Sequence, residues 1–238
     1  MTSRKRMRLV HTSDIHLGMD GINDRSFIAL RAVVDAVLRL DTDMLLMVGD
    51  IFDNARVPDD LVESFIQQIG RLLVPVVVLP GNHDPYDTSS VYHREPFRSP
   101  PENLYIISSP EGETISFPGL RLSVWGKAMA LHTPSFRPLG GMPSRPNGDW
   151  FIALAHGHFH GEHDRDQRSS PIFPEDIASA PCDYIALGHW DRYTDVSQGE
   201  VKACYSGAPR TIAGSSPGHV ALVELDPEKG IQVHRAPL

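Results

Sequence analysis

The sequence predicts an α/β fold in which two β-sheets pack face to face, with helices on the outside. In the first half of the chain, apolar runs of strand length alternate with longer segments whose apolar residues recur at helical spacing. In the second half, short strand-like runs follow one another and are separated by proline or glycine. The first pattern favours a parallel sheet joined by right-handed crossovers, whereas the second favours strands joined by loops.

Five elements are predicted in the first half. The strands are apolar runs at residues 7–12, 44–48 and 74–79. The two helices occupy residues 23–39 and 58–73, where apolar side chains recur along one face. Proline is favoured in the first turn of a helix, so Pro58 marks the start of the second one.

The second half is predicted to contain strands and loops. A meander of three short strands is predicted at residues 104–107, 114–117 and 120–125. Five further strands are predicted at residues 150–155, 184–187, 203–206, 220–225 and 231–234. Two proline-rich stretches, residues 84–101 and 132–147, are long enough to be functional loops rather than simple connections.

Composition limits the class of protein. A chain of 238 residues without an internal repeat or a linker predicts one domain over residues 1–238. The net charge of −8 argues against a basic nucleic-acid platform, although two bound divalent cations would add positive charge where an anionic substrate docks. No apolar stretch approaches the roughly 20 residues that span a bilayer, so no membrane partner is expected. The two cysteines, Cys182 and Cys204, and the lack of a signal peptide indicate a reducing, cytoplasmic location.

Polar clusters follow five of the predicted strands. In chain order they are Asp14-Ile15-His16, Gly49-Asp50-Ile51-Phe52-Asp53, Gly81-Asn82-His83-Asp84, His156-Gly157-His158 and Gly188-His189-Trp190-Asp191. In α/β sheets, ligands bind in the crevice beyond the carboxyl ends of the strands. We therefore expect the five clusters to converge in space.

The residue types in these clusters are those of a metal site. Carboxylate, imidazole and amide-oxygen ligands suit manganese, iron or zinc, and the absence of thiolates argues against a closed structural zinc site. In Asp14-x-His16 and His189-x-Asp191, residues two apart in extended backbone point to the same side, so each pair could hold one ion. Any one of these motifs is more often a surface pair or a turn. Five of them, each at a strand end, favour the metal site.

The order of the motifs resembles the signature of the calcineurin-like metallophosphoesterases over residues 14–191. The resemblance implies a four-layer αββα sandwich of two facing sheets flanked by helices. It also implies two divalent metal ions, most simply manganese, with iron and zinc as alternatives. Hydrolysis of a phosphate ester would then use a hydroxide that bridges the two metals.

The same resemblance implies a role for each site residue. The first metal would be bound by Asp14, His16, Asp50 and Asp191. The second metal would share Asp50 and would also be bound by Asn82, His156 and His189. His83 would contact the scissile phosphate and help the leaving group depart, and Asp53 would orient His83 through a hydrogen bond. No residue is assigned to binding the rest of the substrate.

Within this superfamily, four stretches look like the SbcD-type DNA-repair exonucleases: residues 14–18, 49–53, 184–189 and 205–209. The chain departs from that pattern in two respects. Position 191 carries a carboxylate where the family has a histidine, which would favour a harder ion if Asp191 is a ligand. The alternative is that Asp191 pairs with a surface cation such as Arg192. SbcD-type nucleases also continue into a capping region and a segment that binds a coiled-coil ATPase, and the length of this chain supports neither.

Three hypotheses follow for function. The first is a nuclease-like phosphodiesterase that acts on DNA or RNA. The acidic balance counts against processive degradation of duplex DNA, since non-specific DNA affinity depends on Lys and Arg. The second is a phosphatase or phosphodiesterase for nucleotides or other small esters, which the compact single domain favours. The third is an inactive metal-binding scaffold, which would be expected to have lost His83 or Asp50, and both are present.

Overall fold

The computed structural model describes residues 4–20, 25–146, 148–161, 168–210 and 218–238. The first of its two large sheets has the strand order β14-β13-β1-β2-β3-β4. Strands β1 to β4 run parallel, and β13 and β14 extend the sheet in antiparallel fashion. The strands span Met7–Thr12 (β1), Met44–Val48 (β2), Val76–Leu79 (β3), Leu104–Ile106 (β4), His219–Asp226 (β13) and Gly230–Pro237 (β14).

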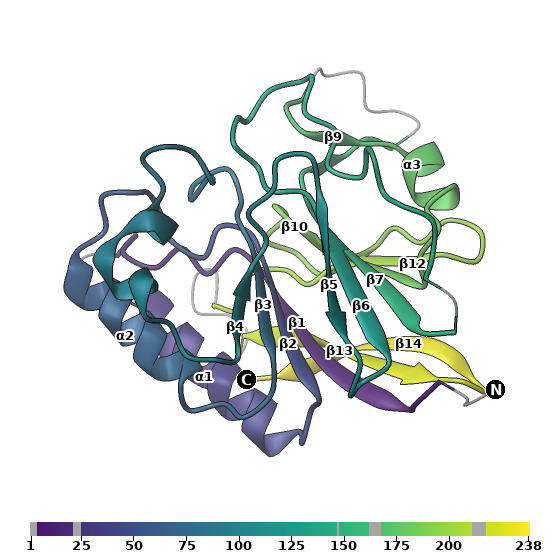
Figure 1. Cartoon of the computed structure of the whole chain (residues 1–238), viewed down its shortest axis with the longest axis horizontal. Helices are drawn as coiled ribbons and strands as arrows, with labels where there is room; N and C mark the ends of the chain where they lie inside the picture. Colours follow the sequence, from purple (N-terminus) through teal and green to yellow (C-terminus); the bar gives the residue numbers. More distant parts are fainter. Residues whose placement is uncertain (1–3, 21–24, 147, 162–167, 211–217) are drawn as a thin grey trace.

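The second sheet has the order β11-β12-β10-β7-β6-β5 and lies against the first (Figure 1). Strands β6, β7, β10 and β12 run parallel, while β5 and β11 are antiparallel edge strands. The strands span Glu113–Phe117 (β5), Leu122–Gly126 (β6), Trp150–His156 (β7), Tyr184–Gly188 (β10), Thr194–Asp195 (β11) and Lys202–Tyr205 (β12). A small separate sheet pairs β8 (His158–Phe159) with β9 (Pro171–Ile172).

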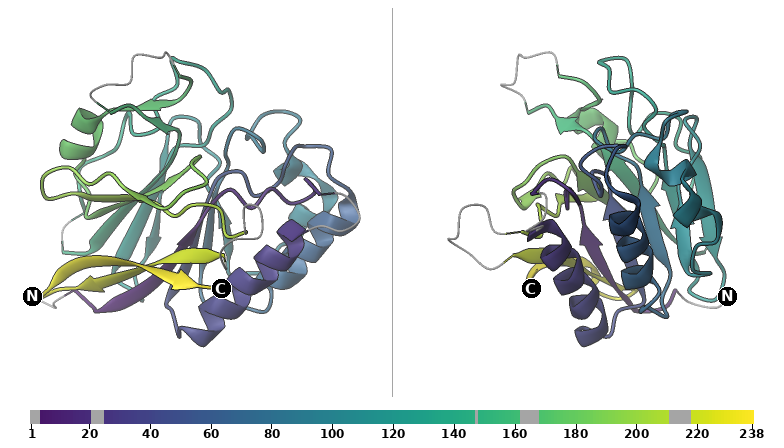
Figure 2. Two further views of the ribbon diagram at one scale, coloured as in Figure 1. Left: turned by 180° about the vertical axis from the view of Figure 1, so that it is seen from behind. Right: turned by 90° about the vertical axis from the view of Figure 1, so that its left-hand side faces the viewer.

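Helices cover the outer faces unequally. The long helices α1 (Arg25–Arg39) and α2 (Asp59–Ile69) lie side by side on the first sheet (Figure 2). The outer face of the second sheet is covered by the short helix α3 (Pro174–Ala178) and by loops. Two short 3₁₀ helices, η2 (Val91–His93) and η3 (Glu95–Arg98), lie in the loop after β3. Within the described residues, no helix is both long enough and apolar enough to cross a membrane.

The core has three layers because alternate strand residues face opposite sides of each sheet. In β2, Leu45 and Met47 pack under the two long helices, whereas Leu46 and Val48 pack between the sheets. Every residue of β2 is buried. A central parallel strand covered on both faces is expected to be apolar throughout, and this packing fixes where the polar residues after β2 emerge.

The predicted meander is wrong in its first strand. Strand β4 pairs parallel with β3 at the edge of the first sheet, and only β5 and β6 form an antiparallel hairpin, in the second sheet. The chain therefore changes sheets between β4 and β5. Hydrophobic spacing identifies a strand but does not specify its partner, which explains the error.

Candidate metal centre

The five polar clusters meet where the two sheets face each other, beyond the carboxyl ends of β1, β2, β3, β7 and β10. Hydrogen bonds join clusters of different sheets directly. The His156 imidazole donates from Nδ1 to the Val48 carbonyl oxygen over 2.9 Å. The His189 backbone N–H donates to Asp14 Oδ2 over 3.0 Å. The predicted convergence of the clusters is thus present in the fold.

One compact group of potential ligands consists of Asp50, His156 and His189. His156 Nε2 lies 3.3 Å from Asp50 Oδ2 and 3.1 Å from Asn82 Oδ1. His189 Nδ1 lies 3.0 Å from the same Asn82 oxygen. These four side chains are the set that the family resemblance implies for the second metal.

A second compact group consists of His16, Asp50 and His83. His16 Nε2 lies 3.9 Å from Asp50 Oδ2, so Asp50 belongs to both groups. The Nδ1 atom of His16 is buried and makes no hydrogen bond, although Asp53 Oδ1 is 3.4 Å away. Asp14 is buried beside this group but belongs to neither compact set.

His83 lies at the open side of the centre, and its side chain is 44% exposed. Its Nδ1 donates to the backbone carbonyl oxygen of Asp53 over 2.9 Å, whereas the Asp53 carboxylate is 3.9 Å from Nδ1. The carbonyl rather than the carboxylate therefore orients the ring. With Nδ1 committed to this bond, Nε2 is the nitrogen that remains for a substrate.

Asp191 stands apart from the other predicted ligands. Its side chain is exposed and belongs to neither compact group of the described chain. Its backbone carbonyl accepts a hydrogen bond from the Ala208 N–H over 3.1 Å, which joins the end of β10 to the loop after β12. Metal binding by Asp191 remains a prediction.

The backbone at the site is left-handed rather than extended. Asp14, His16 and Asp50 have φ angles of 55°, 54° and 54°, and His189 has 105°. Non-glycine residues rarely adopt such angles, and those that do cluster at functional sites. The explanation that Asp14 and His16 share a side through extended backbone is therefore wrong. Strand β1 ends at Thr12, and two left-handed residues turn the chain so that both side chains face the centre.

Two glycines allow the clusters to approach one another. A Cβ atom at Gly81 would lie 2.2 Å from Asp50 Oδ1. A Cβ atom at Gly188 would lie 1.8 Å from the Val48 carbonyl oxygen and 2.7 Å from His156 Nδ1. All three separations are shorter than the contacts that a Cβ atom makes in proteins, so a larger residue at either position would push the strand ends apart. Close approach therefore explains why these two positions carry glycine.

Asp84 has a role that the sequence did not reveal. Its side chain is fully buried, and its carboxylate accepts five hydrogen bonds, from the backbone N–H groups of Asp50, Ile51, Phe52 and Gly81 and from the Tyr92 hydroxyl. These bonds hold the turn after β2 against the turn after β3. Its position in Gly-Asn-His-Asp was the available signal, but burial of a charged residue is read from the fold.

The electrostatics of the centre are dominated by closely spaced buried charges. Burial raises the pKa of Asp14 to about 7, and the neighbouring Asp50 carboxylate adds to the effect. Burial opposes charge on His156, but the Asp50 and Asp14 carboxylates outweigh it and raise the pKa of His156 to about 9. Burial and the charge of His156 lower the pKa of His189 to about 3. Two buried carboxylates so close together favour a bound cation.

The residues present fit divalent metal ions. Because His156 Nδ1 must donate to the Val48 carbonyl, a neutral His156 turns the lone pair of Nε2 towards two oxygen atoms, Asp50 Oδ2 and Asn82 Oδ1. Such converging lone pairs repel one another unless a proton or a cation lies between them. A ligand histidine whose other nitrogen donates to a backbone carbonyl is the usual arrangement in metal sites. Asp50, Asn82, His156 and His189 would hold one ion, and Asp50 with His16 would hold another.

Comparison with known proteins identifies the family to which the chain belongs. The family model described as "Calcineurin-like phosphoesterase" matches residues 7–193. The chain is 25% identical over 223 residues to the "Uncharacterized metallophosphoesterase YhaO" of Bacillus subtilis (strain 168), covering 84% of this chain and 52% of that protein. It is 26% identical over 260 residues to the SbcD component of the nuclease SbcCD from the same organism, covering 92% of this chain and 66% of that protein. The chain thus spans between about half and two thirds of the length of these relatives.

Solved structures confirm the fold class. A dimetal phosphatase from Danio rerio superposes with a TM-score of 0.59 at 10% identity, covering 97% of this chain and 98% of that one. The protein TT1561 of Thermus thermophilus superposes with a TM-score of 0.61 at 12% identity, covering 97% and 99%. The purple acid phosphatase PPD1 from yellow lupin gives 0.56 at 12% identity, covering 98% and 53%. At these identities the likeness concerns the sandwich fold alone, and it agrees with the fold predicted from sequence.

Proposed function

The chain belongs to the calcineurin-like phosphoesterase family, and we propose that it is a dinuclear-metal phosphodiesterase with nuclease-like activity. The observation that carries the proposal is the shared position of Asp50, whose carboxylate belongs to both compact groups of potential ligands. Among the curated relatives, the nuclease component matches 92% of this chain, which supports the diesterase assignment.

Two bound divalent ions would supply Lewis acidity and an activated water molecule. The chain's own residues position the metal ligands and the group that acts on the leaving oxygen. Asp84 holds the turns that carry Asp50 and His83 in register. The Val48 carbonyl fixes the tautomer of His156. His83, held through Nδ1 by the Asp53 carbonyl, presents Nε2 at the open side, where it can stabilise or protonate the departing oxygen of a substrate.

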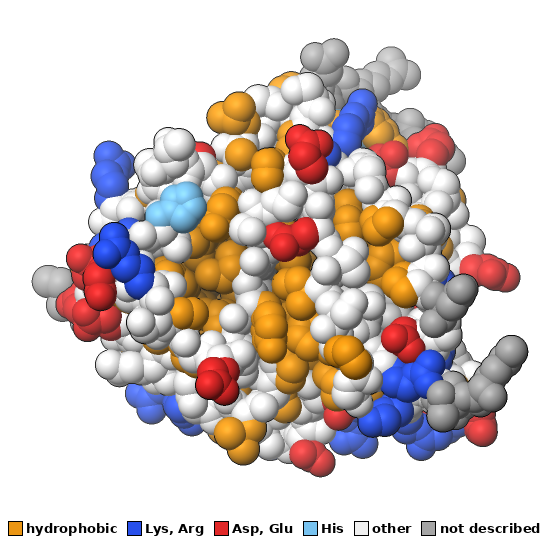
Figure 3. Space-filling model, viewed as in Figure 1, with side chains coloured by type: hydrophobic (Ala, Val, Ile, Leu, Met, Phe, Trp, Pro, Cys, Tyr) orange, Lys and Arg blue, Asp and Glu red, His pale blue; other side chains and the backbone are white. Residues whose placement is uncertain are grey.

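A second candidate, hydrolysis of nucleotides or other small phosphate esters, is favoured by the charge of the chain. The net charge is −8. On the face drawn in Figure 3, Lys and Arg side chains lie mostly near the edges, and hydrophobic side chains fill the middle. Binding of long DNA gains most of its affinity from contacts between cations and phosphates. A short substrate would depend on such contacts much less.

The two candidates are separated by the ester that is hydrolysed. With manganese as the proposed metal, the purified protein is given bis(p-nitrophenyl) phosphate, p-nitrophenyl phosphate and end-labelled single-stranded DNA. We expect turnover of the diester and shortening of the labelled DNA. The Asp50→Asn protein, prepared identically, controls for contaminating enzymes. Hydrolysis of the monoester alone would contradict the diesterase proposal.

We also propose that the protein works in a reducing compartment such as the cytoplasm. Cys182 and Cys204 are both free and buried. Burial raises the pKa of each thiol to about 12, so neither forms a thiolate near neutral pH. Buried thiols of this kind are inert and are compatible with a reducing environment.

A further inference from the structure

We propose that Arg210 binds the phosphoryl oxygens of the substrate on the His16 side of the centre. This inference rests on the proposed phosphoesterase function and adds a substrate-binding residue to it. Arg210 lies in the loop that follows β12, on the same edge of the sandwich as the candidate ligands.

The loop that carries Arg210 is tied to both neighbouring strand ends. The Ser206 and Ser13 hydroxyls are hydrogen-bonded over 2.9 Å, next to Asp14. The Ala208 N–H donates to the carbonyl oxygen of Asp191 over 3.1 Å. This loop is therefore held between the end of β1 and the end of β10, which carry the residues assigned to the first metal.

The side chain of Arg210 extends from this loop towards the segment that carries His16. Its Nη1 atom lies 2.8 Å from the sulfur of Met19, and the Met19 N–H donates to the His16 carbonyl oxygen over 3.1 Å. These contacts place the guanidinium beside the first-metal side.

Arg210 has only weak hydrogen-bond acceptors among the described residues. A thioether is a weak acceptor, and the Nε atom of Arg210 is buried without any hydrogen-bond partner. No ion pair among the described residues includes Arg210. A buried donor left unpaired costs about 1–3 kcal/mol, so it calls for an explanation such as a missing ligand.

Several other arginines in the described chain pair with carboxylates. Arg4 and Arg145 both pair with Asp183, at 3.1 and 2.6 Å. Arg121 pairs with Asp149 at 2.9 Å. Among the described residues Arg210 has no such partner, which favours an oxygen of the substrate as its acceptor.

Phosphate is the ligand whose chemistry fits. A guanidinium presents a planar fork of N–H donors that matches two oxygens of a phosphoryl group, and these charge-assisted bonds are among the strongest in proteins. The carboxylates of Asp14, Asp50 and Asp53 gather at this side of the centre and repel an anion. A cationic side chain next to them would offset that repulsion and orient the substrate.

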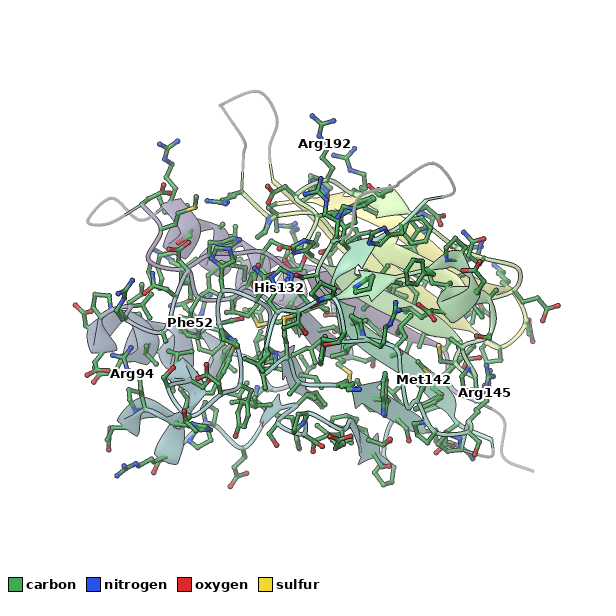
Figure 4. All side chains as sticks on the ribbon, turned by 90° about the horizontal axis from the view of Figure 1, so that it is seen from above. Phe52, Arg94, His132, Met142, Arg145 and Arg192 are labelled. Atoms are coloured by element: carbon green, nitrogen blue, oxygen red, sulfur yellow. The ribbon has the colours of Figure 1, made fainter. Side chains whose placement is uncertain are left out.

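The test compares Arg210→Gln with Arg192→Gln. Arg192 is exposed and extends away from the fold in Figure 4, so it serves as the matched control. The probe is inorganic phosphate, titrated into the manganese-loaded proteins by isothermal calorimetry, with manganese content measured separately. Because this measurement needs no turnover, it tests Arg210 even if the diester is not hydrolysed.

We expect Arg210→Gln to weaken phosphate binding by about 10- to 100-fold at unchanged manganese content, as for a lost hydrogen bond to a charged group. Arg210→Lys should restore part of the affinity, and Arg192→Gln should bind phosphate as the unmodified protein does. If the protein hydrolyses the diester, the weaker substrate binding of Arg210→Gln should appear mainly as a higher KM. Unchanged phosphate affinity in Arg210→Gln would overturn the proposal. Loss of manganese in that variant would also overturn it, because Arg210 would then support the metal site instead.

Discussion

The two sides of the centre are built differently. On the side of Asn82, His156 and His189, the two histidines stand directly at the ends of β7 and β10. The potential ligand atoms on this side, including Asp50 Oδ2, approach within 3.0–3.3 Å of one another. On the side of His16, the nearest ligand approach to Asp50 is 3.9 Å, and Asp191 lies outside the group. Strand ends packed between two sheets leave little freedom, whereas the His16 side depends on turns and an exposed residue. We infer that the side of Asn82, His156 and His189 binds its metal more tightly.

His83 belongs spatially to the looser side, and its replacement should have the largest effect. His83→Ala should lower kcat by about 100- to 10,000-fold, because it removes the group proposed to act on the leaving oxygen. Manganese content should stay nearly the same. Steady-state kinetics with the diester and metal analysis of the same sample check this prediction. Equal loss of metal and activity would show that His83 is a metal ligand instead.

Asp84 holds the turn after β2 against the turn after β3, and its loss should destabilise the fold. Asp84→Ala leaves four backbone N–H groups without their acceptor, so the free energy of unfolding should fall by at least about 3 kcal/mol. Tyr92→Phe removes only one of the five hydrogen bonds and should cost about 1 kcal/mol. Urea denaturation measures both. Similar losses in the two variants would contradict the role assigned to Asp84.

His11 connects the strands that lead to the two sides. It lies fully buried in β1, donates from Nε2 to the Leu187 carbonyl over 3.2 Å, and accepts from the Tyr184 hydroxyl at Nδ1 over 2.9 Å. Burial lowers the pKa of His11 from 6.5 to about 3. As the pH falls, the unfolded chain therefore takes up this proton before the folded chain does. The stability that a neutral His11 provides is complete above about pH 6.5 and is lost as the pH falls towards 3.

When the pH falls from 7 to 4.5, protonation of His11 in the unfolded chain should by itself lower the free energy of unfolding by about 2–3 kcal/mol. His11→Gln should reduce the difference in stability between the two pH values by that amount, whatever its effect at pH 7. Chemical denaturation of the metal-free proteins at both pH values provides the measurement. An identical pH dependence in the variant and the unmodified protein would refute the assignment.

The smallest predicted effect concerns position 191. Asp191→His restores the imidazole that the family carries there and should strengthen the weaker manganese site by about 10-fold or more, since changes around metal ligands alter affinity by that order. The tighter site should be unchanged. A manganese titration followed by calorimetry resolves the two sites. No change in either site would indicate that residue 191 does not reach a metal.

Much of this architecture could be predicted from the sequence because the strands of a buried parallel sheet are strongly apolar. The limits of β2 agree with those predicted, and the polar clusters after five strands do converge. Strand pairing is harder to predict from sequence, because it depends on which sheet edge is available. Strand β4 shows this, since it pairs with β3 rather than with the strands that follow it. The left-handed backbone at Asp14 and His16 was also missed, since tertiary contacts impose it against the local preference.

Two features of the site depend on contacts between residues far apart in sequence. Asp84 supports a turn that lies more than thirty residues earlier in the chain. Arg210 reaches Met19 across nearly the whole sequence. Each is a charged residue in a loop, for which exposure is the usual expectation. Only the folded arrangement distinguishes them from other charged residues of the chain.

The proposed function requires that the Asp50 carboxylate binds two metal ions. Metal analysis of the manganese-loaded protein and of Asp50→Asn, each after removal of free metal, tests it most directly. Under the proposed function we expect two manganese ions per chain in the unmodified protein and fewer than one in Asp50→Asn, with folding of the variant verified by circular dichroism. Retention of two ions by folded Asp50→Asn, or no more than one ion in the unmodified protein at saturating manganese, would contradict the account.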